Sequence, residues 1–105
     1  MDKARREWLK AAGWRTGDAA DFLELSEEEA AFVELKVALA EHLRRLRKRH
    51  SWTQTAVARR LGSSQSRVAK MEAADASVSL DLLVRALLTL GVTREEVGRV
   101  IATAA

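Results

Sequence analysis

A group of five polar and basic side chains just past the middle of the chain could contact a nucleic acid. Ser64, Gln65, Ser66, Arg67 and Lys70 are polar or basic groups at the start of an expected helix. A Gln amide can form two hydrogen bonds with the N6/N7 edge of adenine, and Arg or Lys suits the O6/N7 edge of guanine. Displayed at one end of a helix, these residues favour contact with base edges in the major groove of DNA. A polar residue such as Gln65 can also simply cap or solvate its helix.

Positive charge is concentrated around these residues. The chain of 105 residues carries 18 Lys and Arg against 15 Asp and Glu, a net charge of only +3. Between Leu43 and Met71, however, nine basic residues occur without one acidic residue. Such a cluster is typical of a phosphate-binding surface, although a charge run can also be a solvated helix face. Arg49, Arg59 and Arg60 are the candidates for phosphate contacts.

The composition argues against an enzyme, a metal protein or a membrane protein. Without cysteine there is no disulfide, no Cys-based zinc site and no thiol nucleophile. His42 and His50 are isolated and expected on the surface, and no glycine-rich phosphate loop occurs. We therefore expect no catalytic residue, no metal and no cofactor. The chain also lacks the apolar stretch of a signal peptide or of a membrane span, which needs about 20 residues, and this predicts a cytoplasmic protein without a membrane partner.

The apolar pattern predicts an all-α protein. Ser26 and the three glutamates after it form a capping box, from which a long helix runs to about Arg49. The expected apolar stripe of that helix is Phe32, Leu35, Leu39, Leu43 and Leu46. Shorter helices are expected at residues 53–61, 65–73 and 80–90.

Both ends of the chain have a distinct expected organisation. A last helix begins at a second capping box, Thr93 to Glu96, and carries Val97, Val100 and Ile101 on one face. Residues 1–25, with a short helix at 2–12 and a connector at 14–25, form an N-terminal extension to a domain at 26–105.

Residues 53–73 have the spacing of a helix-turn-helix motif. Ala58 is small where the second helix must cross the first, and Gly62 can adopt the positive φ that the tight turn needs. Each helix also offers apolar residues to the core, namely Val57, Leu61, Val68 and Met71. Trp52, just before the motif, is expected to pack against this core.

The stretch TQTAVARRLGSSQSRVAKMEA, residues 53–73, resembles the DNA-binding unit of the XRE family, which includes the lambdoid phage repressors. The resemblance covers roughly residues 39–91. It implies a lambda-repressor-like domain of about five helices, with a long first helix and an N-terminal helical extension. It also implies that Gln54 contacts phosphate, that Ser64 lies near the DNA backbone, and that Gln65, Ser66 and Lys70 read bases, with Arg67 beside them.

The sequence shows one further similarity to this family and one departure from its pattern. Residues 11–50 are similar to a bacterial subgroup that includes HigA-type antitoxins. At Ala73-Ala74-Asp75, on the other hand, many XRE relatives have an Asn/Glu-Gly pair closing the second motif helix. This departure calls the local backbone and its phosphate contact into question, but not the fold.

These observations favour a transcriptional repressor that binds a palindromic operator in double-stranded DNA as a homodimer. The dimer contact is expected on the face of Val97, Val100 and Ile101, or on that of Val33 and Val37. The HigA resemblance implies an antitoxin and autorepressor, with a RelE/HigB-like toxin as partner. The alternatives are a prophage-type or stand-alone XRE repressor without a toxin, and a protein-binding antitoxin with weak DNA binding. Helix-turn-helix geometry also occurs in proteins that bind no nucleic acid.

Overall fold

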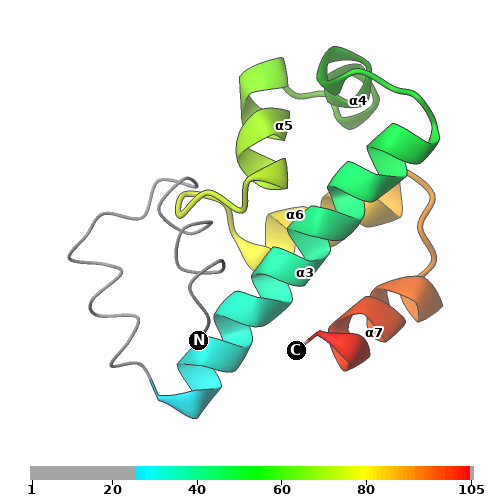
Figure 1. Ribbon diagram of the computed structural model, residues 1–105. Helices are drawn as coiled ribbons and strands as arrows, with labels where there is room; N and C mark the ends of the chain where they lie inside the picture. Colours follow the sequence, from blue (N-terminus) through cyan, green and yellow to red (C-terminus); the bar gives the residue numbers. More distant parts are fainter. Residues whose placement is uncertain (1–25, 105) are drawn as a thin grey trace.

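The computed structural model describes residues 26–104, and it is all-helical there, as predicted (Figure 1). Within this part of the chain the helices are α3 (Glu27–Arg49), α4 (Gln54–Leu61), α5 (Gln65–Glu72), α6 (Leu80–Thr89) and α7 (Arg94–Thr103). The helix expected at residues 2–12 and the connector at 14–25 lie outside the described residues.

A Ser or Thr hydroxyl caps the start of every described helix. Ser26, Thr53, Ser64, Ser79 and Thr93 each accept a hydrogen bond from the backbone N–H three residues further on. These bonds satisfy donors that have no partner inside the helix, and each cap is worth about 1 kcal/mol. The starts of the helices follow from these local signals.

The two expected capping boxes are not alike. At the start of α3 the Ser26 hydroxyl donates to the carboxylate of Glu29, at 3.3 Å. At the start of α7 the Thr93 hydroxyl caps as expected, but the Glu96 carboxylate contacts Nε2 of His42 on α3, at 3.2 Å. His42 is therefore not the exposed surface residue that the sequence predicted, since only 15% of its side chain is accessible. Its partner lies 54 residues away, where no local pattern could indicate it.

The long helix α3 is the element on which the other helices assemble. It runs diagonally through the view of Figure 1, and α5, α6 and α7 contact it. Leu39 and Leu43 of α3, Met71 of α5, and Leu83 and Leu87 of α6 are the large residues at the centre of this core.

A smaller apolar cluster joins the two motif helices. It consists of Val57, Ala58 and Val68, and it lies against Trp52 and Leu61. Ala58 is 3% exposed, which agrees with its expected place at the helix crossing. Both motif helices thus bury the faces that the sequence predicted.

The apolar stripe predicted along the first half of α3 was partly wrong. Phe32 is 51% exposed, whereas Val33 and Val37 are buried. Adjacent residues differ by about 100° around a helix, so a buried face that contains Val33 turns Phe32 to the side. From Leu39 to Leu46 the predicted stripe is buried as expected.

The predicted dimer face on α7 does not exist as one exposed surface. Val97 is 6% exposed and belongs to the core, and Val100 is partly buried against it, so that only Ile101 of the three is exposed. The reason is that α7 packs its apolar side against α3 of the same chain. The alternative residues, Val33 and Val37, are buried as well.

The loop that follows α5 is held by a buried lysine. Nζ of Lys36 on α3 donates to the backbone oxygen of Asp75, at 2.9 Å. Burial lowers the pKa of Lys36, and the nearby Asp75 carboxylate opposes this shift. Ala74 adopts a φ of 48°, so the turn has the left-handed backbone of a glycine without containing one.

None of the described helices is long and apolar enough to cross a membrane.

Gly62 and Gly98 allow a matched test of the motif turn. Gly62 ends α4 with a φ of 64°, and a Cβ at either glycine would meet no atom within 4 Å. We expect Gly62→Ala to lower the free energy of unfolding by about 1 kcal/mol, because alanine disfavours the left-handed region. In contrast, Gly98→Ala inside α7 should raise it by about 0.5–1 kcal/mol. Urea denaturation of both variants checks this, and changes of the same sign would contradict it.

Candidate nucleic-acid interface

The four residues predicted to read bases lie together on the outer side of α5. Gln65, Ser66, Arg67 and Lys70 are all exposed, and α4 and α5 are joined by the short turn at residues 62–64. The hydroxyl of Ser64 accepts a hydrogen bond from the N–H of Arg67, at 3.2 Å. Ser64 therefore fixes the start of α5, next to the residues expected to read bases. Their roles toward DNA stay predictions.

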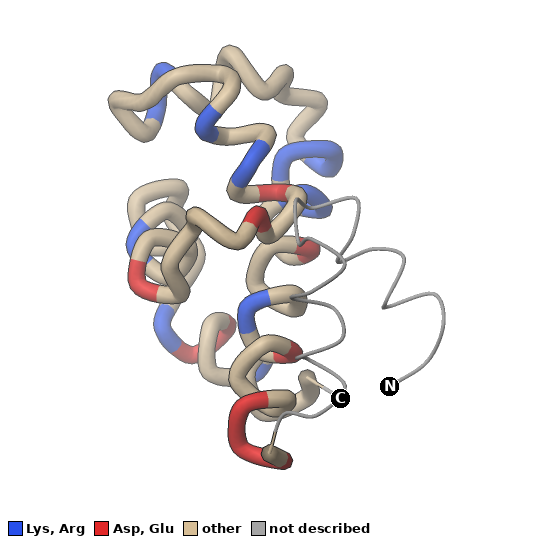
Figure 2. Tube along the Cα trace, turned by 90° about the vertical axis from the view of Figure 1, so that its left-hand side faces the viewer, with Lys and Arg blue, Asp and Glu red and all other residues tan. Residues whose placement is uncertain are grey.

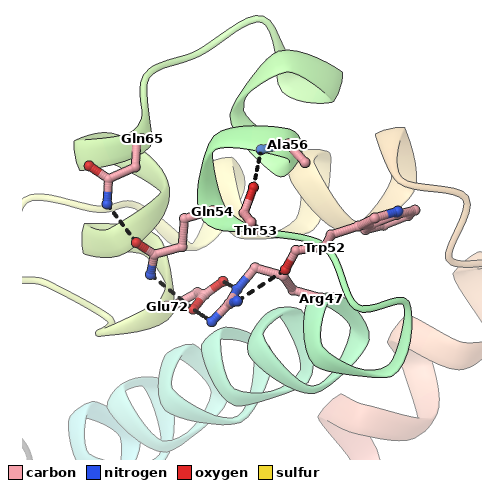
Figure 3. Close-up of polar contacts among 7 residues, drawn as sticks. All are labelled: Arg47, Trp52, Thr53, Gln54, Ala56, Gln65 and Glu72. Atoms are coloured by element: carbon pink, nitrogen blue, oxygen red, sulfur yellow. Dashed lines mark hydrogen bonds and ion pairs between the residues drawn. The ribbon is translucent and has the colours of Figure 1, made fainter.

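A chain of hydrogen bonds connects the exposed Gln65 to the interior. Nε2 of Gln65 donates to Oε1 of Gln54, at 2.6 Å, and Nε2 of Gln54 donates to the carboxylate of Glu72, at 3.3 Å (Figure 3). Gln54 is the first residue of α4 and Gln65 is the first residue of α5. The hydrogen bond between their side chains therefore links the two motif helices. The structure thereby joins a residue predicted to contact phosphate with one predicted to contact bases.

A buried ion pair lies at the inner end of this chain. Nε and Nη2 of Arg47 donate to the two carboxylate oxygens of Glu72, at 2.6 and 3.0 Å. The side chains are only 17% and 5% exposed, and the hydrogen bonds with Glu72 raise the pKa of Arg47. Nη1 of Arg47 also donates to the backbone oxygen of Trp52, at 3.2 Å (Figure 3). One guanidinium group thus joins the end of α3, the segment before α4 and the last turn of α5.

Sequence reasoning missed this ion pair. In the sequence Arg47 belongs to the basic cluster, and Glu72 follows directly after Met71, where that cluster ends. The two residues are 25 positions apart on different helices, so no helical spacing relates them. The only available signal was an acidic residue in the last turn of the second motif helix, facing inward beside Met71.

Trp52 has a double role beside the motif. It is half-buried and packs against Val57, Ala58 and Val68, as predicted. The guanidinium of Arg60 also lies 4.2 Å from the centre of its ring, and the His50 ring stacks on it at 4.3 Å. Cation–π contacts of this kind contribute roughly 0.5–2 kcal/mol. They hold the Arg60 side chain beside the start of α4.

Charge is distributed unevenly over the two ends of the domain. Figure 2 shows the Lys and Arg segments gathered toward the end that carries α4, α5 and the last turns of α3, with acidic residues at the opposite end, where α3 begins. Arg49, Arg59, Arg67 and Lys70 are exposed. Glu72, an acidic residue at the basic end, is buried against Arg47, so its charge subtracts little from the surface field. Such a field attracts a polyanion to this end.

The rest of the described chain shows no metal-binding cluster. Across residues 26–104, no group of three or more His, Cys, Asp or Glu side chains is placed to hold a metal ion.

Comparison with known proteins gives one match. A family model described as a helix-turn-helix domain matches residues 38–100, which is more than half of the chain. The matched range runs from the middle of α3 into α7 and includes the whole motif. No curated protein and no solved structure matches the sequence.

The buried ion pair yields a stability prediction. We expect Glu72→Leu to lower the free energy of unfolding by about 1–3 kcal/mol, because the half-buried charge of Arg47 is then left without its partner. In the double variant Arg47→Met/Glu72→Leu most of this loss should disappear. As a control, Glu41→Gln at the exposed pair with Arg45 should change stability by less than about 1 kcal/mol. Denaturant titration measures all three, and a double variant no more stable than Glu72→Leu would argue against the coupling.

Proposed function

Because the chain belongs to the family of helix-turn-helix domains, we propose that it binds a specific double-stranded DNA sequence and represses transcription there. The observation that carries this proposal is the hydrogen-bond chain behind Gln65. An exposed amide at the start of α5 is held in place by Gln54 and, through it, by the buried pair of Glu72 and Arg47. A side chain that is only solvated has no need of such support.

The geometry of Gln65 suits a bidentate contact with adenine. One of its amide N–H groups is directed to Gln54. The second N–H group and the Oε1 atom are the donor and the acceptor that pairing with the N7 and N6 groups of adenine requires. Gln65 can therefore keep its bond to Gln54 while reading a base. We assign base reading to Gln65 together with Ser66, Arg67 and Lys70 of the same helix.

Phosphate contacts come from the residues around this helix. Gln54 is the first residue of α4, where backbone N–H groups and the helix dipole favour an anion. Arg49, Arg59 and Arg60 surround the motif with exposed positive charge, and Ser64 lies at the start of α5. In this proposal they supply most of the affinity and its dependence on salt, while α5 supplies the selectivity.

We further propose that two copies bind as a homodimer. One recognition helix covers only a few base pairs, and helix-turn-helix dimers place two such helices one DNA turn apart. Because Val97 belongs to the core, only Ile101 of the face first expected on α7 is exposed. Ile101 can contribute to the contact, as can Leu88, an exposed apolar residue of α6.

An additional antitoxin role is supported by the acidic end of the domain. Glu27, Glu28 and Glu29 lie there in the first turn of α3, close in sequence to the exposed Phe32. An apolar side chain with neighbouring negative charge suits a small basic protein such as a RelE/HigB-like toxin. This surface is remote from the proposed DNA surface, so both roles are compatible. An adjacent reading frame for a basic toxin supports the role, and an isolated gene counts against it.

The DNA-binding proposal is tested by selecting bound sites from random DNA. The selected sites should be palindromic, with half-sites about 10 base pairs apart. On that site, Gln65→Ala should weaken binding by about 1–3 kcal/mol and relax the preference at one base pair, while Arg94→Gln on α7 should bind almost normally. Gel-shift titration measures this. No enriched sequence would refute specific binding, and an unchanged Gln65→Ala variant would refute its assigned role.

Salt dependence tests the phosphate contacts separately. The logarithm of the affinity falls linearly with the logarithm of the salt concentration, with a slope of about −0.9 for each phosphate neutralised. We expect Arg59→Gln to reduce this slope by about 0.9 on specific and unrelated DNA alike, since it loses one such contact. The control Arg99→Gln removes the same charge from α7 and should leave the slope unchanged. Equal slopes for both variants would exclude Arg59 from the interface.

A further inference from the structure

A second feature of the motif lies on the side of the turn that faces α6. There the structure has an open hollow of about 200 Å³. Leu61, Met71 and Leu82 make its lining largely apolar, and the exposed residues Arg67 and Arg85 also line it. The hollow thus combines an apolar lining with two guanidinium groups. Neither guanidinium group takes part in the helix packing described above.

Ser63 gives this hollow a distinct polar group. The Ser63 hydroxyl oxygen is buried, and within the described chain it has no hydrogen-bond partner. Buried hydroxyls are nearly always paired, because removal from water without a new hydrogen bond is unfavourable. Ser63 also lines the hollow. Because the oxygen is covered, a ligand oxygen supplies the missing partner once the Ser63 side chain turns toward the hollow.

The two arginines define the charge of a suitable ligand. Arg85 pairs with Asp81 at 3.2 Å, but both side chains are more than 70% exposed, and such pairs contribute little and exchange readily. A guanidinium group binds a carboxylate through two parallel hydrogen bonds. An organic acid can therefore engage Arg85 without a large loss elsewhere. Arg67, which also lines the hollow, adds a second positive charge.

The size of the hollow limits the carbon skeleton of this acid. Drug-sized ligands usually occupy about 300–1,000 Å³, which is more than this hollow offers. An apolar cavity of about 150 Å³ is large enough for benzene. A carboxylate with one ring, or with about six carbons, therefore matches the volume.

We propose that this hollow binds a small apolar carboxylate and that the bound acid weakens DNA binding. The acid lies on Leu61, Met71 and Leu82, with its carboxylate between Arg67 and Arg85 and one oxygen toward Ser63. Arg67 is one of the residues assigned above to base reading, so its engagement by the acid removes it from DNA. This second step rests on the proposed function, whereas binding of the acid does not.

The binding step is tested on the full chain without DNA, with benzoate as the probe. In a ¹H–¹⁵N NMR titration we expect saturable shifts centred on Gly62, Ser63 and Arg67, with a dissociation constant on the order of 1 mM. Benzyl alcohol, which keeps the ring but has no charge, should bind about tenfold more weakly. Shifts that do not saturate, or that centre on another surface, would overturn the site.

Variants distinguish benzoate binding in this hollow from a general attraction of benzoate to a positively charged protein. Arg85→Gln and Ser63→Ala should each weaken benzoate binding several-fold, whereas Arg99→Gln, which removes the same charge from α7, should not. Ser63→Ala should keep a melting temperature at least equal to that of the natural protein, because it deletes an unpaired buried hydroxyl. A clear fall in its melting temperature would mean that the hydroxyl is already paired, and benzoate binding unaffected by Arg85→Gln would refute the carboxylate contact.

The regulatory step is tested with the selected DNA site. Benzoate at ten times its dissociation constant should weaken DNA binding severalfold relative to sodium chloride of equal concentration, and Arg85→Gln should abolish this difference. Saturable benzoate binding with unchanged DNA affinity would refute the regulatory step alone. If the protein bound no DNA, the proposed function would fail while the NMR titration still decided the ligand site.

Discussion

The contact between Arg47 and Glu72 is the constraint on which the arrangement of the motif depends. It joins α3 to the last turn of α5, and the same guanidinium group holds the backbone oxygen of Trp52 just before α4. Apolar packing alone fixes helices only approximately, because side chains can interdigitate at neighbouring registers. A bidentate ion pair has one good geometry, and breaking it leaves a buried charge. The pose of α5 relative to α3 is therefore strongly specified.

This contact also explains how the basic end of the domain keeps its charge outside. Arg47 belongs to the same run of cations as Arg44, Arg45, Lys48 and Arg49, yet its charge is matched internally by Glu72. The neighbouring cations are exposed, and they belong to the end of the domain where Figure 2 shows most Lys and Arg segments. One residue of the run therefore serves the fold, and the others are left to act on a polyanion. A count of charges along the sequence cannot distinguish these two uses.

The predictable part of the structure is the part encoded by local signals. The capping hydroxyls of Ser26 and Thr93, the turn at Gly62 and the small Ala58 depend on neighbouring residues, and they were predicted correctly. The errors at Val97, Phe32 and His42, and the missed pair of Arg47 with Glu72, concern contacts between helices far apart in the sequence. Helical periodicity shows that a face is apolar, but it does not show which element covers it. The candidate site shows the same division. Helical spacing predicted that the polar residues of α5 are exposed, but it did not predict the hydrogen bonds from Gln65 through Gln54 to Glu72.

The hydrogen bonds that hold Gln65 affect which side chains provide binding specificity and which provide binding affinity in the proposed complex. Ordering a flexible side chain at an interface costs about 0.5–1.5 kcal/mol. For Gln65 part of this cost is met when the protein folds, because Gln54 already orients the amide and is itself bonded to Glu72. A fixed donor and acceptor also tolerate a wrong base poorly, since they cannot turn to find another partner. Arg49 and Arg59 are exposed side chains whose charge attracts any phosphate backbone. In the proposed complex, discrimination between bases therefore depends most on Gln65, whose side chain is hydrogen-bonded to the interior, and general attraction to DNA depends on side chains without such support.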